Sequence, residues 1–299
     1  MAELIERMFE RDRDLPRIIE HVARSRASSD PHAFLHPGGL QWLLRKLGGA
    51  AFALRQWFDG DTLAGALIAD SGYVIVLAGS ADLDRYLWLL RLGEADARSG
   101  GAAPIEVSVW DDDRELLSVL RSLGYEPNGT YAHELVHELP AVPPEPTLPL
   151  GFSIRRFEPG MDDAFIEMHR SAWSTWRPSS YRAEMHAAVT RMPGFDRGLV
   201  PIIAAPDRTL AAYCLAWFDP VTRWVEIEPL ATRPEFRRLG LGHAIVREVL
   251  RRSALRDASS VMVWGVGTNP EAVRLYESAG FRRRRVLREY RREPEGSRA

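Results

Sequence analysis

The segment with the clearest chemical potential is a strand, a loop and a helix in the second half of the sequence. It reads EIEPLATRPEFRRLGLGHAIVREVL, and its loop contains Arg237-x-x-Gly240-x-Gly242. The glycines let the backbone turn its N–H groups toward one point at the beginning of a helix, where the helix dipole also favours an anion. A pyrophosphate suits this position, although an ordinary helix entry produces the same pattern. The spacing excludes a Walker loop and the dinucleotide fingerprint.

The strand that enters this loop carries two carboxylates. Glu226 and Glu228 are two residues apart, so their side chains point to one face of the strand. A carboxylate placed there can remove a proton from a reacting group, either directly or through a water molecule. The alternative for each residue is an ordinary solvated strand face.

The elements around the loop follow a mixed α/β order. Apolar spacing and turn residues predict strands at 152–154, 199–204, 209–218, 223–232 and 261–266, and helices at 161–173, 181–192, after the loop that ends at Gly242, and at 270–279. A final pair of strands is expected after Phe281. An antiparallel hairpin is thus followed by β-α-β-α-β.

The first half of the chain repeats part of this pattern. IEVSVWDDDRELLSVLRSLGY resembles VMVWGVGTNPEAVRLYESAGF, and aligning Gly124 with Gly280 places Leu120 on Tyr276. The first half begins differently, with a helix expected from Leu4 to about Arg24 and a loop around residues 36–39. The repeat predicts a duplicated α/β domain.

A proline-rich segment divides the two copies. Of the 299 residues, those from 140 to 150 include five prolines, which is too many for a helix or a central strand. We therefore expect a first domain at 1–138, a linker at 139–150 and a second domain at 151–299. The first domain carries a formal charge of −8 and the remainder +6, which indicates different tasks.

Together with a second motif, the loop identifies a resemblance to a known family. About 30 residues after it come Asn269-Pro-Glu-Ala272-x-x-Leu275-Tyr276-x-x-x-Gly280-Phe281, with a strand between the two motifs. Residues 151 to about 292 resemble the GNAT superfamily of N-acetyltransferases. The resemblance implies two tandem domains, each with a mixed, mostly antiparallel sheet flanked by helices. It also implies acetyl-CoA as co-substrate, bound by Leu230, Ala231, Thr232, Arg237, Arg238, Gly240, Leu241, Gly242, His243 and Asn269.

Acetyl transfer to an amine requires a base, a donor for the oxyanion and an acid for the departing thiolate. In the family, the tyrosine of the second motif commonly protonates the thiolate, which implies Tyr276. Family members place a base at positions equivalent to both Glu226 and Glu228, so the choice between them, or a water, stays open. For Tyr276, core packing is the alternative role.

The first copy lacks the features that bind a cofactor. Where its phosphate loop should follow a strand, the sequence is VIVLAGSADLDRYLWLL, with Asp82 and Asp84 at the position of the anion. These carboxylates would repel a pyrophosphate. We interpret residues 1–138 as a degenerate copy and the second domain as the active one.

The acceptor pocket in this fold lies between the first two helices and the splayed strands. The corresponding segment here is SAWSTWRPSSYRAE, in which Trp173, Trp176, Arg177 and Tyr181 can clamp a flat or carboxylated acceptor. Packing against the first domain is the alternative role for these residues.

Composition limits which functions and partners the sequence is compatible with. The single cysteine, Cys214, and the absence of His/Glu ligand spacing argue against a metal site, and no apolar stretch approaches membrane-spanning length. We expect a cytoplasmic monomer or homodimer that acetylates a primary amine of a small molecule or a peptide N-terminus. The alternative is a non-catalytic acyl-CoA sensor with the same fold. The acidic first half disfavours nucleic acid as a partner.

Overall fold

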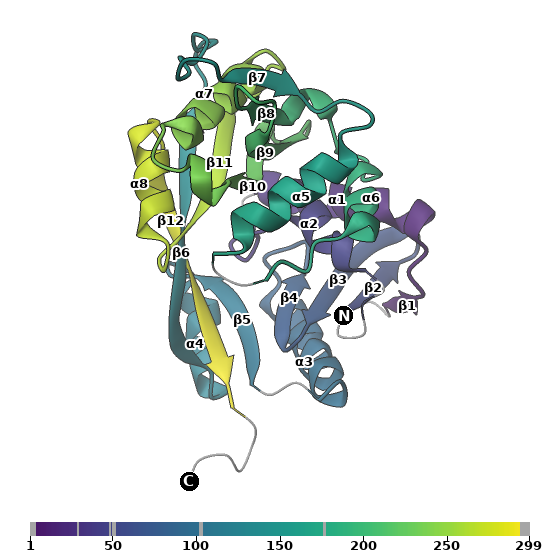
Figure 1. Cartoon of the computed structure of the whole chain (residues 1–299). Coiled ribbons are helices and arrows are strands. Elements are labelled where there is room, and N and C mark those ends of the chain that lie inside the picture. The colour runs from purple at the N-terminus through teal and green to yellow at the C-terminus, as the bar shows by residue number, and fades with distance from the viewer. Residues whose placement is uncertain are drawn as a thin grey trace.

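A computed structural model describes residues 4–28, 30–47, 49, 52–101, 104–175 and 178–293. Two lobes share one sheet, as Figure 1 shows. The described strands are β1 Ile5–Arg7, β2 Phe52–Asp59, β3 Thr62–Asp70, β4 Tyr73–Leu77, β5 Ile105–Trp110, β6 Glu126–Glu138, β7 Ser153–Arg156, β8 Pro201–Ala204, β9 Leu210–Asp219, β10 Trp224–Thr232, β11 Ser260–Val266 and β12 Arg282–Arg292. The described helices are α1 Arg11–Ala27, α2 Pro37–Leu43, α3 Leu83–Ser99, α4 Arg114–Ser122, α5 Asp162–Trp173, α6 Ala183–Thr190, α7 Leu241–Ala254 and α8 Pro270–Ser278, with short 3₁₀ turns at η1 Leu44–Lys46, η2 Arg197–Leu199 and η3 Pro234–Phe236.

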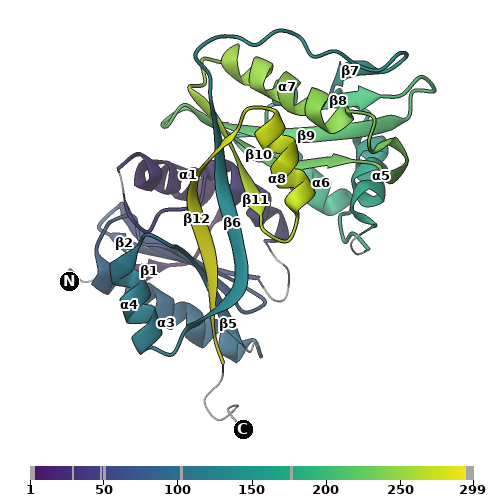
Figure 2. The same ribbon diagram turned by 90° about the vertical axis from the view of Figure 1, so that its left-hand side faces the viewer.

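The two halves exchange their last strands. The order in the sheet is β1-β2-β3-β4-β5-β12-β6-β11-β10-β9-β8-β7. Strand β6, from the first half, pairs along β11, while β12, from the second half, pairs with β5. Figure 2 shows β6 and β12 running side by side from one lobe to the other. The mixed, mostly antiparallel sheet flanked by helices is therefore confirmed, but hydrogen bonds cross between the halves.

Three expectations about local structure are wrong. The chain from Ile5 to Arg7 is not helical, because it pairs with β2 as an edge strand, and helix α1 begins only at Arg11. The expected loop at 36–39 begins helix α2, where Pro37 takes the first helical position and His36 accepts the N–H of Gly38. The expected final strand pair is the single strand β12, because its partners β5 and β6 belong to the first half.

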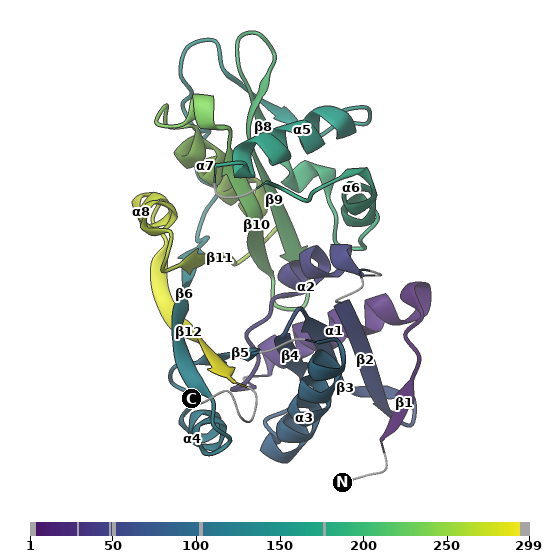
Figure 3. The same ribbon diagram turned by 60° about the horizontal axis from the view of Figure 1, so that its bottom comes forward.

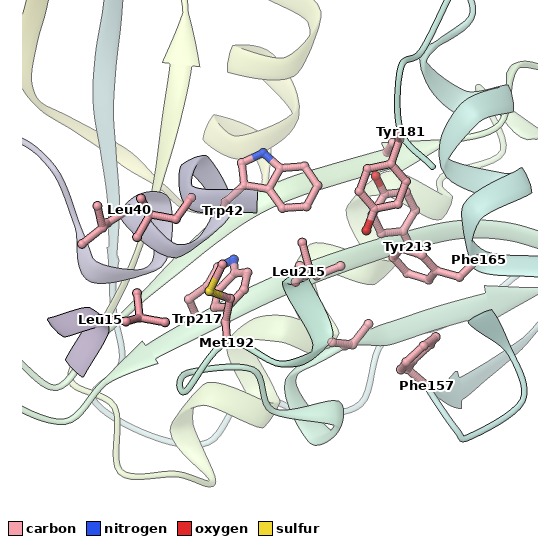
Figure 4. Close-up of a cluster of buried hydrophobic side chains, with 14 of the residues drawn as sticks. Leu15, Leu40, Trp42, Phe157, Phe165, Tyr181, Met192, Tyr213, Leu215 and Trp217 are labelled. Carbon is pink, nitrogen blue, oxygen red and sulfur yellow. The ribbon is translucent and has the colours of Figure 1, made fainter. Parts of the chain in front are cut away.

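A hydrophobic core joins the lobes. Leu15 of α1 and Leu40 and Trp42 of α2 pack in one cluster with Phe165 of α5 and Trp217 of β9. Figure 3 shows α2 lying between the lobes, and Figure 4 shows these side chains spread along one cluster, from Leu15 and Leu40 at one end to Phe165 at the other. Continuous apolar burial of this kind fixes the orientation of α2 against the second half.

Two further cores lie on the opposite face of the sheet. One lies under α7 and α8 in the second half and the other under α3 and α4 in the first. No helix among the described residues is both long and apolar enough to cross a membrane.

Candidate active site

The site begins where two parallel strands separate. β10 pairs with β11 only from Trp224 to Glu226, and a bulge against β9 follows between Ile227 and Leu230. The separation leaves a cavity of about 410 Å³, which we call the strand cavity. It is lined by Ala172, Trp173, Ile227, Glu228, Pro229, Leu230, Ala231, Thr232, Arg237, Val263, Trp264, Val266, Asn269, Glu271, Ala272, Leu275 and Tyr276. The cavity thus brings together residues from both predicted motifs.

The glycine loop presents backbone donors. Arg238 and Gly240 have positive φ angles of 65° and 78°, which turn the chain into the N-terminus of α7. Among the described residues, no group accepts a hydrogen bond from the N–H groups of residues 238–243. At Gly242, an added Cβ would come within 3.2 Å of Leu275, so this turn of α7 lies close against α8. Free donors at the positive end of a helix form an anion site.

The side chain of Arg237 links the strand and the helix that border the cavity. Its guanidinium donates to the carbonyl of Thr232 at 3.2 Å, to that of Ala172 at 2.8 Å and to the hydroxyl of Thr175 at 3.1 Å. These bonds hold the end of β10 to the end of α5. Arg237 therefore braces the mouth of the strand cavity, and the loop N–H groups and the exposed Arg238 remain for an anion.

Asn269 and Tyr276 belong to one short helix. The Asn269 side chain caps α8 by accepting the N–H of Ala272 at 3.2 Å, and it also lines the strand cavity. The Tyr276 hydroxyl has no hydrogen-bond partner within the described part of the chain. Burial, and then the negative charges that Cys214 and Glu228 can carry, raise the Tyr276 pKa above its ordinary value. The hydroxyl therefore keeps its proton at neutral pH.

Glu228 lies between the strand cavity and a second cavity. Its backbone carbonyl accepts the Trp217 indole N–H at 2.7 Å, which holds this irregular part of β10 in place. Burial is the main cause that raises the pKa of its carboxyl to about 7, and repulsion from Glu226 adds to it, while Arg45 acts in the opposite sense. A carboxylate with such a pKa can accept a proton near neutral pH.

Glu226 serves the contact between the lobes. Its carboxylate accepts the N–H of Gly39 at the beginning of α2 and lies 3.3 Å from Nδ1 of His36. A Cβ at Gly38 would overlap Trp217, so the glycine pair is what allows this close approach. Glu226 is 1% exposed and lines neither cavity. The two carboxylates that the sequence left equivalent have different surroundings.

Replacing Glu226 by glutamine tests whether Glu226 is the base or only influences the pKa of Glu228. Because Glu226 raises the pKa of Glu228, Glu226→Gln is expected to move the ascending limb of the pH profile of turnover to lower pH by about 0.5–1 unit. The plateau turnover should stay within about threefold of the wild type, since loss of a base costs far more. A pH series of steady-state rates measures both quantities. If the variant folds but its turnover is lost at every pH, Glu226 is the base.

The second cavity lies between the lobes and measures about 620 Å³; we call it the interlobe cavity. It is lined by Trp42, Arg45, Lys46, His169, Trp173, Pro178, Ser179, Ser180, Tyr181, Met185, Glu228 and Pro229. Trp173 and Tyr181 thus lie where the sequence placed them, whereas Trp176 and Arg177 lie outside the described residues. Sequence reasoning missed Trp42, Arg45 and Lys46, because no local pattern in the first half marks them.

Buried hydrogen bonds support one wall of the interlobe cavity. The Trp173 indole donates to the Tyr213 hydroxyl at 3.2 Å, and that hydroxyl lies 2.6 Å from Nδ1 of His169. The Tyr181 hydroxyl lies 3.0 Å from Nδ1 of His186. Burial, followed by the charges of Arg45 and His186, lowers the pKa of His169 to about 3, so it is neutral. These bonds fix the aromatic rings in place.

The first half differs from the second in what surrounds its own separating strands. Among the described residues, β4 and β5 pair only at Tyr73 and Glu106. A cavity of about 20 Å³ at the end of β4 has room for about one water. His32 enters it and lies 2.6 Å from Asp113, which caps α4 as Asn269 caps α8 in the repeat. Asp82 caps its own helix, α3, by accepting the N–H of Arg85. Asp82 and Asp113 therefore serve as helix caps in the first half.

Comparisons with known proteins agree with this architecture. A model of the acetyltransferase (GNAT) family matches residues 163–281. A mycothiol acetyltransferase of Kineococcus radiotolerans is 35% identical over 141 residues, covering 46% of this chain and 45% of that protein. Another, from Acidimicrobium ferrooxidans, is 28% identical over 187 residues, covering 60% and 59%. The chain matches about half the length of these curated relatives.

Solved structures show the same fold over nearly the whole chain. A GCN5-related N-acetyltransferase from Sphaerobacter thermophilus superposes with a TM-score of 0.64 at 21% identity, covering 97% of this chain and 95% of that one. A tandem GNAT protein from the clavulanic acid biosynthesis pathway gives 0.66 at 15% identity, with 97% and 98% covered. The protein thus has a tandem GNAT fold. Within the second half, residues 163–281 match the family of GNAT acetyltransferases.

Proposed function

We propose that this protein is an acetyl-CoA-dependent N-acetyltransferase that acts on a primary amine of a small molecule. The observation that carries the proposal is the position of Glu228, which borders both the strand cavity and the interlobe cavity. The pantetheine and acetyl group enter from the strand cavity and the acceptor from the interlobe cavity. The reacting atoms then meet beside Glu228.

The residues present divide the chemistry between them. Glu228 removes a proton from the acceptor ammonium, directly or through a water, and the free amine attacks the thioester carbonyl. The tetrahedral intermediate loses the second nitrogen proton to water and collapses, the C–S bond breaks, and Tyr276 gives its proton to the thiolate and regains one from water. At Leu230, Ala231 and Thr232, the edge of β10 that faces away from β9 pairs with no described strand and binds the pantetheine amides. The N–H groups of residues 238–243 bind the pyrophosphate, with the exposed Arg238 beside them.

The domain division remains part of the proposal. We assign residues 1–138 to a degenerate copy, 139–150 to the linker and 151–299 to the catalytic copy, with the last strands exchanged between them. The lack of an R-x-x-G-x-G loop after the corresponding strand of the first half supports one acetyl-CoA per chain. A sensor without turnover is not favoured, because such a protein needs neither a base near pH 7 nor an unpartnered tyrosine hydroxyl.

A thiol-release assay with acetyl-CoA and a panel of amines tests the function. The panel should contain amino acids, simple amines, polyamines, aminoglycosides and peptide N-termini, together with the mycothiol precursor that the relatives' names suggest. We expect amine-dependent release of coenzyme A and a calorimetric stoichiometry near one. Binding without release for every acceptor class would favour the sensor, and two equivalent sites per chain would contradict the degenerate first copy.

Changing Gly240 tests the anion loop. Gly240→Val should raise the Kd for acetyl-CoA at least about tenfold, because a branched side chain is strained at φ 78° and stands in the path of the phosphates. Gly160→Val is the matched control: Gly160 has φ 87°, and like Gly240 it has no described atom within 4 Å of an added Cβ. Calorimetry should show normal binding for the control. If both variants bind acetyl-CoA equally well, the loop is not part of the binding site.

A further inference from the structure

Arg45 is the residue through which the first half reaches the interlobe cavity. It lies in η1, directly after α2, and its guanidinium carbon stands 3.9 Å from the centre of the Trp42 ring. Its Nη1 donates to the carbonyl of Trp42. Stacking and this bond hold the plane of the guanidinium in one orientation. Since α2 is fixed in the shared core, Arg45 has a defined position on the cavity wall.

The charge of Arg45 is not neutralised by an ion pair. Among the described residues, no carboxylate lies within 4.0 Å of its guanidinium, whereas the neighbouring Lys46 pairs with Asp70 at 2.5 Å. Burial lowers the pKa of Arg45, and Glu228 is the leading charge that acts against this change. Holding a partly buried cation without a partner is unfavourable. A bound anion would remove that cost.

We propose that the acceptor amine also carries a carboxylate, which Arg45 binds while the amine faces Glu228. The planar guanidinium matches a carboxylate with two parallel hydrogen bonds, and one such fork would remain beside the bond to Trp42. The cavity then has a cation on one side and the base on the other, which matches the two charged groups of an amino acid. Trp42, Trp173 and Tyr181 provide flat walls for its side chain.

This inference rests on the proposed function and gives the degenerate first half a role. The first half supplies Trp42 and Arg45 and the second supplies Glu228, so the cavity is complete only in the intact chain. Arg45 then determines acceptor specificity without touching the thioester. Its removal should therefore change the discrimination between acceptors more than the binding of acetyl-CoA.

Matched pairs of acceptors isolate the carboxylate. Tryptophan and tryptamine, phenylalanine and phenethylamine, and tyrosine and tyramine differ only in that group. For wild-type protein, we expect kcat/KM to be at least about tenfold higher for the amino acid in a pair that is used, the scale of a charge-assisted pair. Arg45→Met should abolish the preference, mainly through KM. Arg45→Lys, which keeps the charge without the fork, should retain part of it.

A binding experiment makes the test independent of turnover. Indole-3-propionate and 3-phenylpropionate lack the amine but keep the carboxylate, and calorimetry should show that they bind wild-type protein at least about tenfold more tightly than Arg45→Met. Arg24→Gln is the matched control, because it removes an exposed arginine of the first half whose ion-pair partner in the described part of the chain is Glu20, on the surface of α1. Thermal unfolding of each variant checks that the fold is kept.

The outcomes separate the two proposals. Amines used as well as amino acids, or an amino acid preference that survives in Arg45→Met, would overturn the role of Arg45 and leave the acetyltransferase intact. Carboxylates that bind wild-type protein through Arg45, with no thiol release for any amine, would keep the anion site and overturn the proposed function. Absence of both carboxylate binding and amino acid preference would overturn the carboxylate site. An aminoalkyl phosphonate preferred over the matching amino acid would do the same, because it would assign Arg45 to a phosphate.

Discussion

Tyr276→Phe is expected to lower turnover on the order of 10²-fold while leaving the Kd for acetyl-CoA nearly unchanged. Phenylalanine keeps the ring that packs against Phe281, whose centre lies 5.9 Å from that of Tyr276, so the core beneath α8 is preserved. Only the hydroxyl in the strand cavity is lost. Without this proton donor, the coenzyme A thiolate is a poorer leaving group. Saturation kinetics with calorimetric binding distinguish the two effects.

Tyr290→Phe provides the control for this variant. Tyr290 is a buried tyrosine of the first-half core, so the same hydroxyl is removed away from both cavities. Its turnover should equal that of the wild type. If Tyr276→Phe also keeps full turnover with a saturating acceptor, Tyr276 is a packing residue and water is the proton source.

Glu228→Gln should lower turnover by about 10²- to 10³-fold at pH 8 and remove the ascending limb of the pH profile. The wild-type carboxyl has a pKa of about 7, so the base is available only as the pH rises through that value. Glutamine cannot accept the proton at any pH. Rates measured from pH 5.5 to 9 test this. A variant that keeps the limb would place the titrating group elsewhere, for example on the acceptor itself.

The same substitution has a predicted effect on stability. Because folding raises the Glu228 pKa from 4.5 to about 7, the stability that its protonated form contributes is full below pH 4.5 and is lost as the pH rises through 7. The variant has no such loss. Relative to the wild type, Glu228→Gln should therefore gain free energy of unfolding between pH 4.5 and 7.

Urea unfolding at several pH values measures this difference. Glu158→Gln, at an exposed position of the same half, should show little pH-dependent change. A constant difference between Glu228→Gln and the wild type across this range would mean that the Glu228 carboxyl titrates normally and is a poor candidate for the base.

Much of the second half was predictable because its signals are local. The loop around Gly240 is recognised by glycines at fixed spacing before an amphipathic helix, and Asn269 begins α8 as a polar cap before proline. Both features depend on hydrogen bonds and dihedral angles within a few residues, which a short stretch of sequence specifies. The repeat likewise showed that Leu120 stands where the second copy has Tyr276.

The tertiary structure decided what those elements do together. Glu226 and Glu228 are equivalent along the strand, yet one meets Gly39, 187 residues away, and the other opens onto two cavities. The exchange of β6 and β12 was equally invisible, because the local sequence of a strand does not specify which strand it pairs with. Arg45 acquires its place at the interlobe cavity only because apolar burial packs α2 against the second half. Such contacts join segments far apart in the chain, and they are set by packing of the whole fold rather than by any local pattern.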